Sequence, residues 1–250
     1  MKLSDKERAV IRESFKTMTV AQRLEYIFTY YKPALLAVAI VLIVVSNVSY
    51  RILTHKDVLL YTAYANIAVG DTLDTALNEG FVRAVKENPG KNEVYLYRGL
   101  YLSQDASTEN HEYAYASQLK VLATIANKQL DVLLMNREAY DLLSSSGYLL
   151  PLDALLAQDD ELAVQLAANL ISNSVILEDN AIEYNLNVAD NYHAITEDAV
   201  NGIDVSSFPM FERAGFSGDV FLGVIGNSPR LDMVLQYIAY LAAEPESDSP

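Results

Sequence analysis

The most regular feature of the hydropathy pattern is an apolar stretch near the N-terminus. Pro33 to Tyr50 contains no charged residue, and Ala34 to Val45 is unbroken apolar sequence. At about 1.5 Å rise per residue, a helix of this length matches a hydrocarbon core of about 30 Å. The pattern predicts a transmembrane helix over residues 33–53. A buried core helix is the less favoured alternative, because a helix that is apolar all round is uncommon in a small soluble domain.

The charges on either side of this helix predict its orientation. Residues 1–32 carry seven Lys or Arg, whereas two follow the span, so the positive-inside rule places the N-terminus in the cytoplasm. A cleaved signal peptide is the alternative, but a leader of 32 residues and the lack of a small-x-small cleavage site favour an uncleaved signal anchor. Residues 1–32 are expected to form a cytoplasmic amphipathic helical segment at the lipid interface, with contact to a partner protein as the alternative.

After the anchor, short β-rich apolar runs alternate with amphipathic stretches. Strands are predicted at Asp57–Ile67, Glu93–Leu102 and Asp131–Met135. A helical pattern follows each strand, so the order is βαβαβα. This order predicts an α/β fold whose sheet is mostly parallel and carries helices on both faces. Late in the chain, another buried strand is predicted at Val220–Gly226, with an amphipathic helix after Pro229.

The predicted extracytoplasmic domain covers residues 57–243. Within it, residues 158–219 are less regular, with one helical pattern followed by polar, Asn-rich sequence. The last residues, 244–250, are typical of a disordered tail because they are polar and charged without an apolar position to bury.

Composition excludes several classes of function. The chain has no Cys, so disulfides, thiolate metal sites and a Cys nucleophile are excluded, and its three His are far apart. The net charge of −15 is unevenly distributed, since residues 57–250 hold nine basic and 29 acidic side chains. A domain with this much negative charge would repel a phosphate backbone, so nucleic acid is not an expected partner.

The sequence also offers little for catalysis or metal binding. The segment GFSGD, residues 215–219, lacks the second Gly of a nucleophile elbow and precedes a strand, whereas an elbow follows one. Acids near residues 178–191 do not have the spacing and Gly turn of a calcium loop. We therefore predict no enzyme activity, no metal site and no cofactor.

Two segments resemble bacterial extracellular solute-binding proteins of transporters. The first is ANKQLDVLLMNREAYDLLSSSGYLLPLDALL, residues 126–156, which is similar to a first-lobe segment with a strand, a short helix and a Gly-x-Leu-x-Pro-Leu-Asp type turn. The second is FLGVIGNSPRLDMVLQYIAYL, residues 221–241, which is similar to the returning strand and helix. Both are packing motifs, so the resemblance bears on the fold more than on the ligand.

The resemblance implies a type II periplasmic-binding-protein fold, in which two α/β lobes hold a ligand in the cleft between them. Two features depart from the family. No lipid-bearing Cys is present, so the transmembrane helix would replace it as the anchor, and residues 158–219 are short for a complete second lobe. The expected architecture is therefore one binding-protein-like lobe with a reduced second lobe or insertion at 158–219.

Candidate ligand residues follow from the predicted sheet. Ligands of open parallel sheets bind beyond the carboxyl ends of the strands, where loops and helix N-termini expose polar groups. The side chains expected there are Tyr64, Asn66, Tyr101, Ser103, Gln104, Asp105, Asn136 and Arg137, with Asn227 and Ser228 after the late strand. The alternative is that they are ordinary turn and capping residues. A further candidate is a sugar-stacking surface formed by Tyr95, Tyr97 and Tyr101 with Tyr113 and Tyr115, but packing on the sheet is the favoured interpretation.

These observations lead to two hypotheses of function. The first is a membrane-anchored solute-binding-like protein of the bacterial cell surface. It would capture a small polar solute such as a sugar or peptide for uptake or sensing, beside a transporter permease or another membrane protein. The second is a non-enzymatic interaction or scaffold module that has lost the ligand site.

Overall fold

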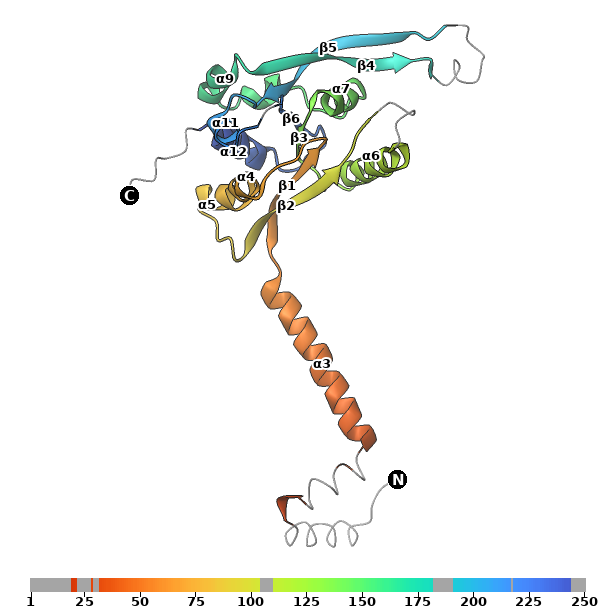
Figure 1. Ribbon diagram of the computed structural model, residues 1–250, viewed down its shortest axis with the longest axis vertical. Helices are drawn as coiled ribbons and strands as arrows, with labels where there is room; N and C mark the ends of the chain where they lie inside the picture. Colours follow the sequence, from red (N-terminus) through yellow and green to blue (C-terminus); the bar gives the residue numbers. More distant parts are fainter. Residues whose placement is uncertain are drawn as a thin grey trace, which may run out of the picture. The chain divides into compact units, whose positions relative to one another are not determined.

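The computed structural model of the 250-residue chain describes residues 19–21, 28, 32–103, 110–181, 191–216 and 218–243, and of residues 51–54 the backbone only. The chain divides into two compact units, residues 1–55 and residues 56–250, which are described separately below (Figure 1). The predicted tail at 244–250 and most of the predicted segment at 1–32 lie outside the described residues.

The described part of the first unit is dominated by helix α3, Lys32–Thr54. Over Lys32–Tyr50 its mean hydropathy is 2.2, and none of this stretch is buried in the structure. A 23-residue helix is about 35 Å long, so α3 is long and apolar enough to cross a membrane. Its bounds agree to within a residue with the span predicted at 33–53.

The second unit, which we call the α/β unit, contains one six-stranded sheet in the order β2-β1-β3-β6-β5-β4. The strands are β1 (Asp57–Ala65), β2 (Asn92–Leu100), β3 (Val132–Met135), β4 (Leu170–Asp179), β5 (Ala194–Asp204) and β6 (Phe221–Val224). The α/β class is therefore confirmed. The expectation of a mostly parallel sheet is only partly right, because the sheet is mixed.

The direction of each strand follows from the connection that precedes it. Strands β2 and β3 both pair with β1 in parallel, as helical crossovers require. Strand β6 instead pairs antiparallel with β3, since the chain reaches it from the carboxyl edge of β3 after the long segment 158–219. Within that segment, β4 and β5 form an antiparallel hairpin that joins β6 through Ile203 and Asp204. The predicted reduced lobe thus contributes two strands to the same sheet.

Helices cover both faces of the sheet, as predicted (Figure 1). The helices of the α/β unit are α4 (Asp71–Thr75), the π-helical turn η1 (Ala76–Gly80), α5 (Phe81–Ala84), α6 (His111–Ala126), α7 (Arg137–Ser145), α8 (Asp153–Leu156), α9 (Asp160–Leu166), α11 (Pro209–Arg213) and α12 (Leu231–Ala242). Helices α6 and α7 cover one face, while α4, α5, α8, α9, α11 and α12 cover the other.

Strand β3 shows why its sequence is apolar without alternation. Leu134 packs into the core under α12, whereas Leu133 and Met135 pack into the core under α6 and α7. All four residues of β3 are buried, as are all four of β6. A strand covered on both faces has no solvent side, which accounts for the continuous apolar runs in both.

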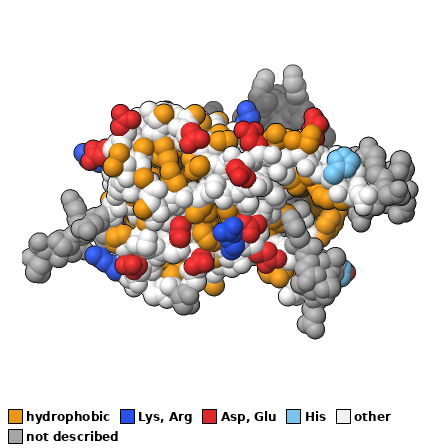
Figure 2. All heavy atoms as spheres, turned by 90° about the horizontal axis from the view of Figure 1, so that it is seen from above, with side chains coloured by type: hydrophobic (Ala, Val, Ile, Leu, Met, Phe, Trp, Pro, Cys, Tyr) orange, Lys and Arg blue, Asp and Glu red, His pale blue; other side chains and the backbone are white. Residues whose placement is uncertain are grey.

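The hairpin of β4 and β5 extends beyond the rest of the sheet (Figure 1). Only the last two residues of β5 pair with β6, so most of the hairpin is a two-stranded ribbon. Figure 2 looks down on the side of the α/β unit that carries β4 and β5. It shows red acidic side chains scattered over that side, blue basic ones at few places, and orange apolar ones between them.

A buried ion pair joins the start of β3 to the start of α12. The Asp131 side chain is fully buried and accepts hydrogen bonds from the Tyr61 backbone N–H at 2.8 Å and from the Ser228 hydroxyl at 2.6 Å. The Arg230 guanidinium lies 3.0 Å from the same carboxylate and over the Tyr61 ring. The carboxylate is thus satisfied from three sides, as a buried charge must be.

Replacing Arg230 by Ala leaves the Asp131 carboxylate buried without its cation. We expect Arg230→Ala to lower the free energy of unfolding by about 3 kcal/mol. The measurement is urea denaturation of the full chain in neutral detergent, followed by tyrosine circular dichroism because the chain has no Trp. The control is Arg83→Ala, which removes an exposed pair with Glu79 and should cost about 0.5 kcal/mol or less. Equal losses in the two variants would contradict a structural role for the buried pair.

Candidate functional site

A large cleft among the described residues lies at the carboxyl edge of β1 and β3 and has a volume of about 1080 Å³. Because β6 runs antiparallel to β3, its first residue, Phe221, lies opposite Met135 at the same edge. The cleft is therefore lined by segments from four places. They are the loop and helix after β1 (between Asn66 and Ala76), the start of α7, α11 with the segments that follow it (Met210, Arg213 to Phe216, Gly218 and Asp219), and Tyr240 of α12.

Asn136 and Arg137 bring the N-terminus of α7 to the cleft. Asn136 is the N-cap residue, and its side-chain oxygen accepts the Ala139 backbone N–H at 3.0 Å. Strand β3 ends at Met135, and α7 begins at Arg137 directly after the cap. Arg137 therefore lies at the edge of the sheet. Both residues were predicted for the site, and both line the cleft.

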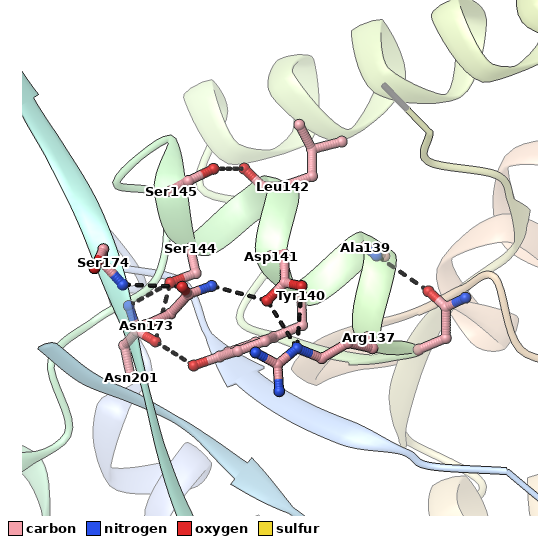
Figure 3. Close-up of polar contacts among 11 residues, drawn as sticks. Arg137, Ala139, Tyr140, Asp141, Leu142, Ser144, Ser145, Asn173, Ser174 and Asn201 are labelled. Atoms are coloured by element: carbon pink, nitrogen blue, oxygen red, sulfur yellow. Dashed lines mark hydrogen bonds and ion pairs between the residues drawn. The ribbon is translucent and has the colours of Figure 1, made fainter. Parts of the chain in front are cut away.

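Figure 3 shows what holds the Arg137 side chain. Its Nε donates to both carboxylate oxygens of Asp141, at 2.9 and 3.0 Å, and the guanidinium lies near the rings of Tyr140 and Phe221. The hydrogen bond to Asp141 raises the pKa of Arg137, so the side chain stays cationic. The terminal nitrogens make no hydrogen bond within the described part of the chain, which leaves them for a ligand.

Asn66 also lines the cleft, but its amide is committed elsewhere. The amide nitrogen donates to the Leu102 carbonyl at 2.6 Å, and the amide oxygen accepts the Leu102 N–H at 2.7 Å. Its φ of 58° lies in the left-handed region, which Asn tolerates better than most residues. Asn66 therefore joins the loops after β1 and β2. Its role in the cleft is to position these loops, because its amide is not available to a ligand.

Charged side chains of both signs line the cleft. Arg213 is exposed at the end of α11 and has no ion pair or hydrogen bond among the described residues. Asp71 and Asp219 line the cleft as well, and Asp219 lies near enough to Arg137 to contribute to its raised pKa. The walls between them include the apolar side chains of Met210 and Phe216. Such a site can hold a solute that is both charged and partly apolar.

Other predicted site residues lie away from the cleft lining. Tyr64 is 4% exposed and packs in the core under α12, where burial together with the Asp74 carboxylate raises its pKa well above the ordinary value. Tyr101 and Ser103 are half-buried after β2 and do not line the cleft. Gln104 and Asp105 lie outside the described residues.

The expectation that Asn227 and Ser228 join this edge is wrong. It assumed that the late strand runs parallel to the others, whereas β6 is antiparallel and ends at the opposite edge. There the Asn227 amide donates to the Ile125 carbonyl at 2.9 Å, and Ser228 bonds to Asp131. Both side chains therefore stabilise the fold at the amino edge of β3.

Sequence reasoning missed Arg213 and Asp219. A signal was present, because no Lys or Arg occurs between Arg137 and Arg213, although that stretch holds 14 acidic residues. A lone cation after so long an acidic stretch is a candidate for a specific role. Asp219 was noticed only as part of GFSGD, and the antiparallel direction of β6 was needed to bring it beside Arg137.

No cluster of metal-ligating side chains is found in the described ranges. No group of three or more His, Asp or Glu there is placed to hold a metal ion. The polar groups of the cleft suit binding, because they offer charges and hydrogen bonds from several elements.

Comparison with known proteins adds no identification. No protein-family model matches the chain, and no curated protein matches it significantly.

The buried tyrosines predict how stability depends on pH. Burial raises the pKa of Tyr64, Tyr140 and Tyr237 above the ordinary value of 10.0. Because the folded state holds these protons more tightly than the unfolded state, stability is unaffected below about pH 10 and falls as the pH rises further. We expect the urea midpoint of the full chain to decrease above that pH. Tyr64→Phe should make the decrease of the urea midpoint with pH shallower. The control, Tyr115→Phe at an exposed position, should leave the decrease unchanged.

Proposed function

We propose that the chain is a non-enzymatic, membrane-anchored protein whose α/β unit captures a small polar solute at the cell surface. The observation that carries this proposal is the cleft of about 1080 Å³ at the carboxyl edge of β1 and β3. Its volume suits a small molecule, and its position is the one where open α/β sheets commonly bind ligands. Three of the predicted ligand residues, Asn66, Asn136 and Arg137, lie in its lining.

The charges of the cleft favour a solute with groups of both signs, such as an amino acid or a short peptide. Arg137 and Arg213 can each donate to a carboxylate, because their terminal nitrogens have no hydrogen-bond partner among the described residues. Asp71 and Asp219 can accept from an ammonium group. A neutral sugar would leave these charges without partners as water is displaced, which is costly.

Binding is measured as a shift in melting temperature of the full chain in neutral detergent. The panel consists of free amino acids, di- and tripeptides, and neutral mono- and disaccharides. At about 100 times its dissociation constant, a ligand adds about 2.7 kcal/mol, and we expect a rise of about 5 °C or more with one amino acid or peptide class. Arg213→Ala should weaken that affinity about tenfold or more, and Arg83→Ala, outside the cleft lining, should not.

The outcomes of this panel separate the solute class from solute capture itself. A shift with sugars alone would overturn the proposal that the solute carries groups of both charges, but it would support solute capture. No shift with any compound, in a chain that melts cooperatively, would overturn solute capture. The function would then be that of an interaction or scaffold module, which the exposed hairpin of β4 and β5 independently favours.

We propose further that α3 spans the membrane and that the α/β unit lies outside the cytoplasm. Support comes from the length and hydropathy of α3 and from the seven Lys or Arg that precede it. We expect alkaline phosphatase fused after Pro250 to be active in a bacterial host, and green fluorescent protein fused there to be dark. The same two reporters fused before Met1 are the control and should behave in the opposite way. Fluorescence from the C-terminal fusion would overturn the orientation.

A further inference from the structure

The root of the β4 and β5 hairpin bonds to α7, and Figure 3 shows these contacts. There the Asn173 amide donates to Asp141 at 2.9 Å, and the buried Asn201 side chain bonds to Tyr140 and Ser144 of α7. The Leu152 N–H also donates to the Val200 carbonyl of β5. Toward the tip of the hairpin from Val200, the described residues show no further backbone hydrogen bond from β5 to the rest of the unit. Residues 174–179 and 194–199 lie beyond this root, and we call them the arm.

The arm has open backbone edges. Strand β4 is at the edge of the sheet, and the arm portion of β5 lies outside the two residues that pair with β6. Within the described ranges, the backbone of the arm bonds across the hairpin, apart from the Ser174 N–H, which donates to the Asn173 side-chain oxygen at 2.9 Å. In an antiparallel pair, roughly half of the N–H and C=O groups of each strand point away from the partner strand. The arm therefore offers a template on which a further strand can pair.

The side chains of the arm are unusual for a strand edge in water. Leu177 is 57% exposed and Ile195 is 59% exposed, and both lie beside the shift in register that follows Ile176. Leu177 sits at an irregularity between Ile176 and Glu178, so it has no direct partner across the hairpin. Covering an apolar side chain of this size with a partner would lower the free energy, because its surface would be removed from water.

The charge of the arm restricts what can cover it. Every charged side chain of the arm is acidic, namely Glu178, Asp179, Glu197 and Asp198. A second copy of the arm would bring these acids together, and like charges on neighbouring strands destabilise the pairing. Acidic side chains on an open edge also oppose self-association in general. A partner strand that carries Lys or Arg is attracted to the arm instead, since each cation can pair with a carboxylate of the arm.

We propose that the arm is a docking site for a protein partner that adds a basic, partly apolar strand to it. Main-chain hydrogen bonds along the open edge would hold the partner strand, as in other cases of strand addition. The acidic side chains would select for Lys and Arg, and Leu177 and Ile195 would be covered by the apolar residues of the same strand. This proposal does not depend on solute binding in the cleft.

The probe is a blocked peptide of about eight residues in which Lys and Val alternate, the length of an ordinary strand. Its affinity for the full chain in neutral detergent is measured by fluorescence anisotropy of a labelled copy. We expect Glu178→Lys with Glu197→Lys to weaken binding about tenfold or more, and Leu177→Ser with Ile195→Ser also to weaken it. The matched control reverses two exposed acids on other elements, Glu87→Lys with Glu112→Lys, and should retain binding within about twofold.

A second peptide distinguishes strand pairing from charge attraction. Methylation of every backbone nitrogen keeps the charge of the side chains and removes the donors of both edges of the peptide, so we expect it to abolish binding. Equal affinity of the methylated and unmethylated peptides would overturn the proposal, because attraction of charge alone would then explain binding. Equal loss in the arm variant and in the control variant would overturn it too. So would a dimer of the full chain that the arm variant dissociates, since the occupant would then be a second copy.

Discussion

The antiparallel pairing of β6 with β3 determines what lies at both edges of the sheet. One end of β6 brings Asp219 and the residues before it to the carboxyl edge of β3, where they close one side of the cleft. The other end brings Ser228 and Arg230 to the amino edge, where they meet Asp131. A parallel strand in the same position would exchange these two sets of residues, and neither the cleft nor the buried ion pair would form.

The two edges illustrate different uses of charge. At the amino edge, Asp131 is buried and all of its partners belong to the chain, so the ion pair specifies how β3, β1 and α12 fit together. At the carboxyl edge, Arg213 is exposed and has no described partner within the chain. The first arrangement is complete without a ligand. The second leaves charge available, and this difference is the reason for placing function at the carboxyl edge.

The sequence predicted α3, the βαβ order around β1 to β3 and the helices on both faces, because these follow from apolar periodicity and capping. It did not predict the direction of β6 or the pairing of β4 with β5, since strand direction after a long irregular segment depends on contacts distant in sequence. The same limit applies to the site. Asn136 and Arg137 follow a strand directly and were found, whereas Arg213 and Asp219 reach the cleft only through the tertiary fold.

Helix α7 connects the cleft with the hairpin. The Asp141 carboxylate accepts from Nε of Arg137 and from the Asn173 amide, both at 2.9 Å, so a cleft residue and a residue of β4 share one acceptor. One turn further along the helix, Ser144 bonds to Asn201 of β5. The Asp141 carboxylate thus has one partner at the cleft and another in β4. The positions of the Arg137 guanidinium and of the β4 root depend on the same acceptor, while Tyr140 and Ser144 hold β5 through Asn201.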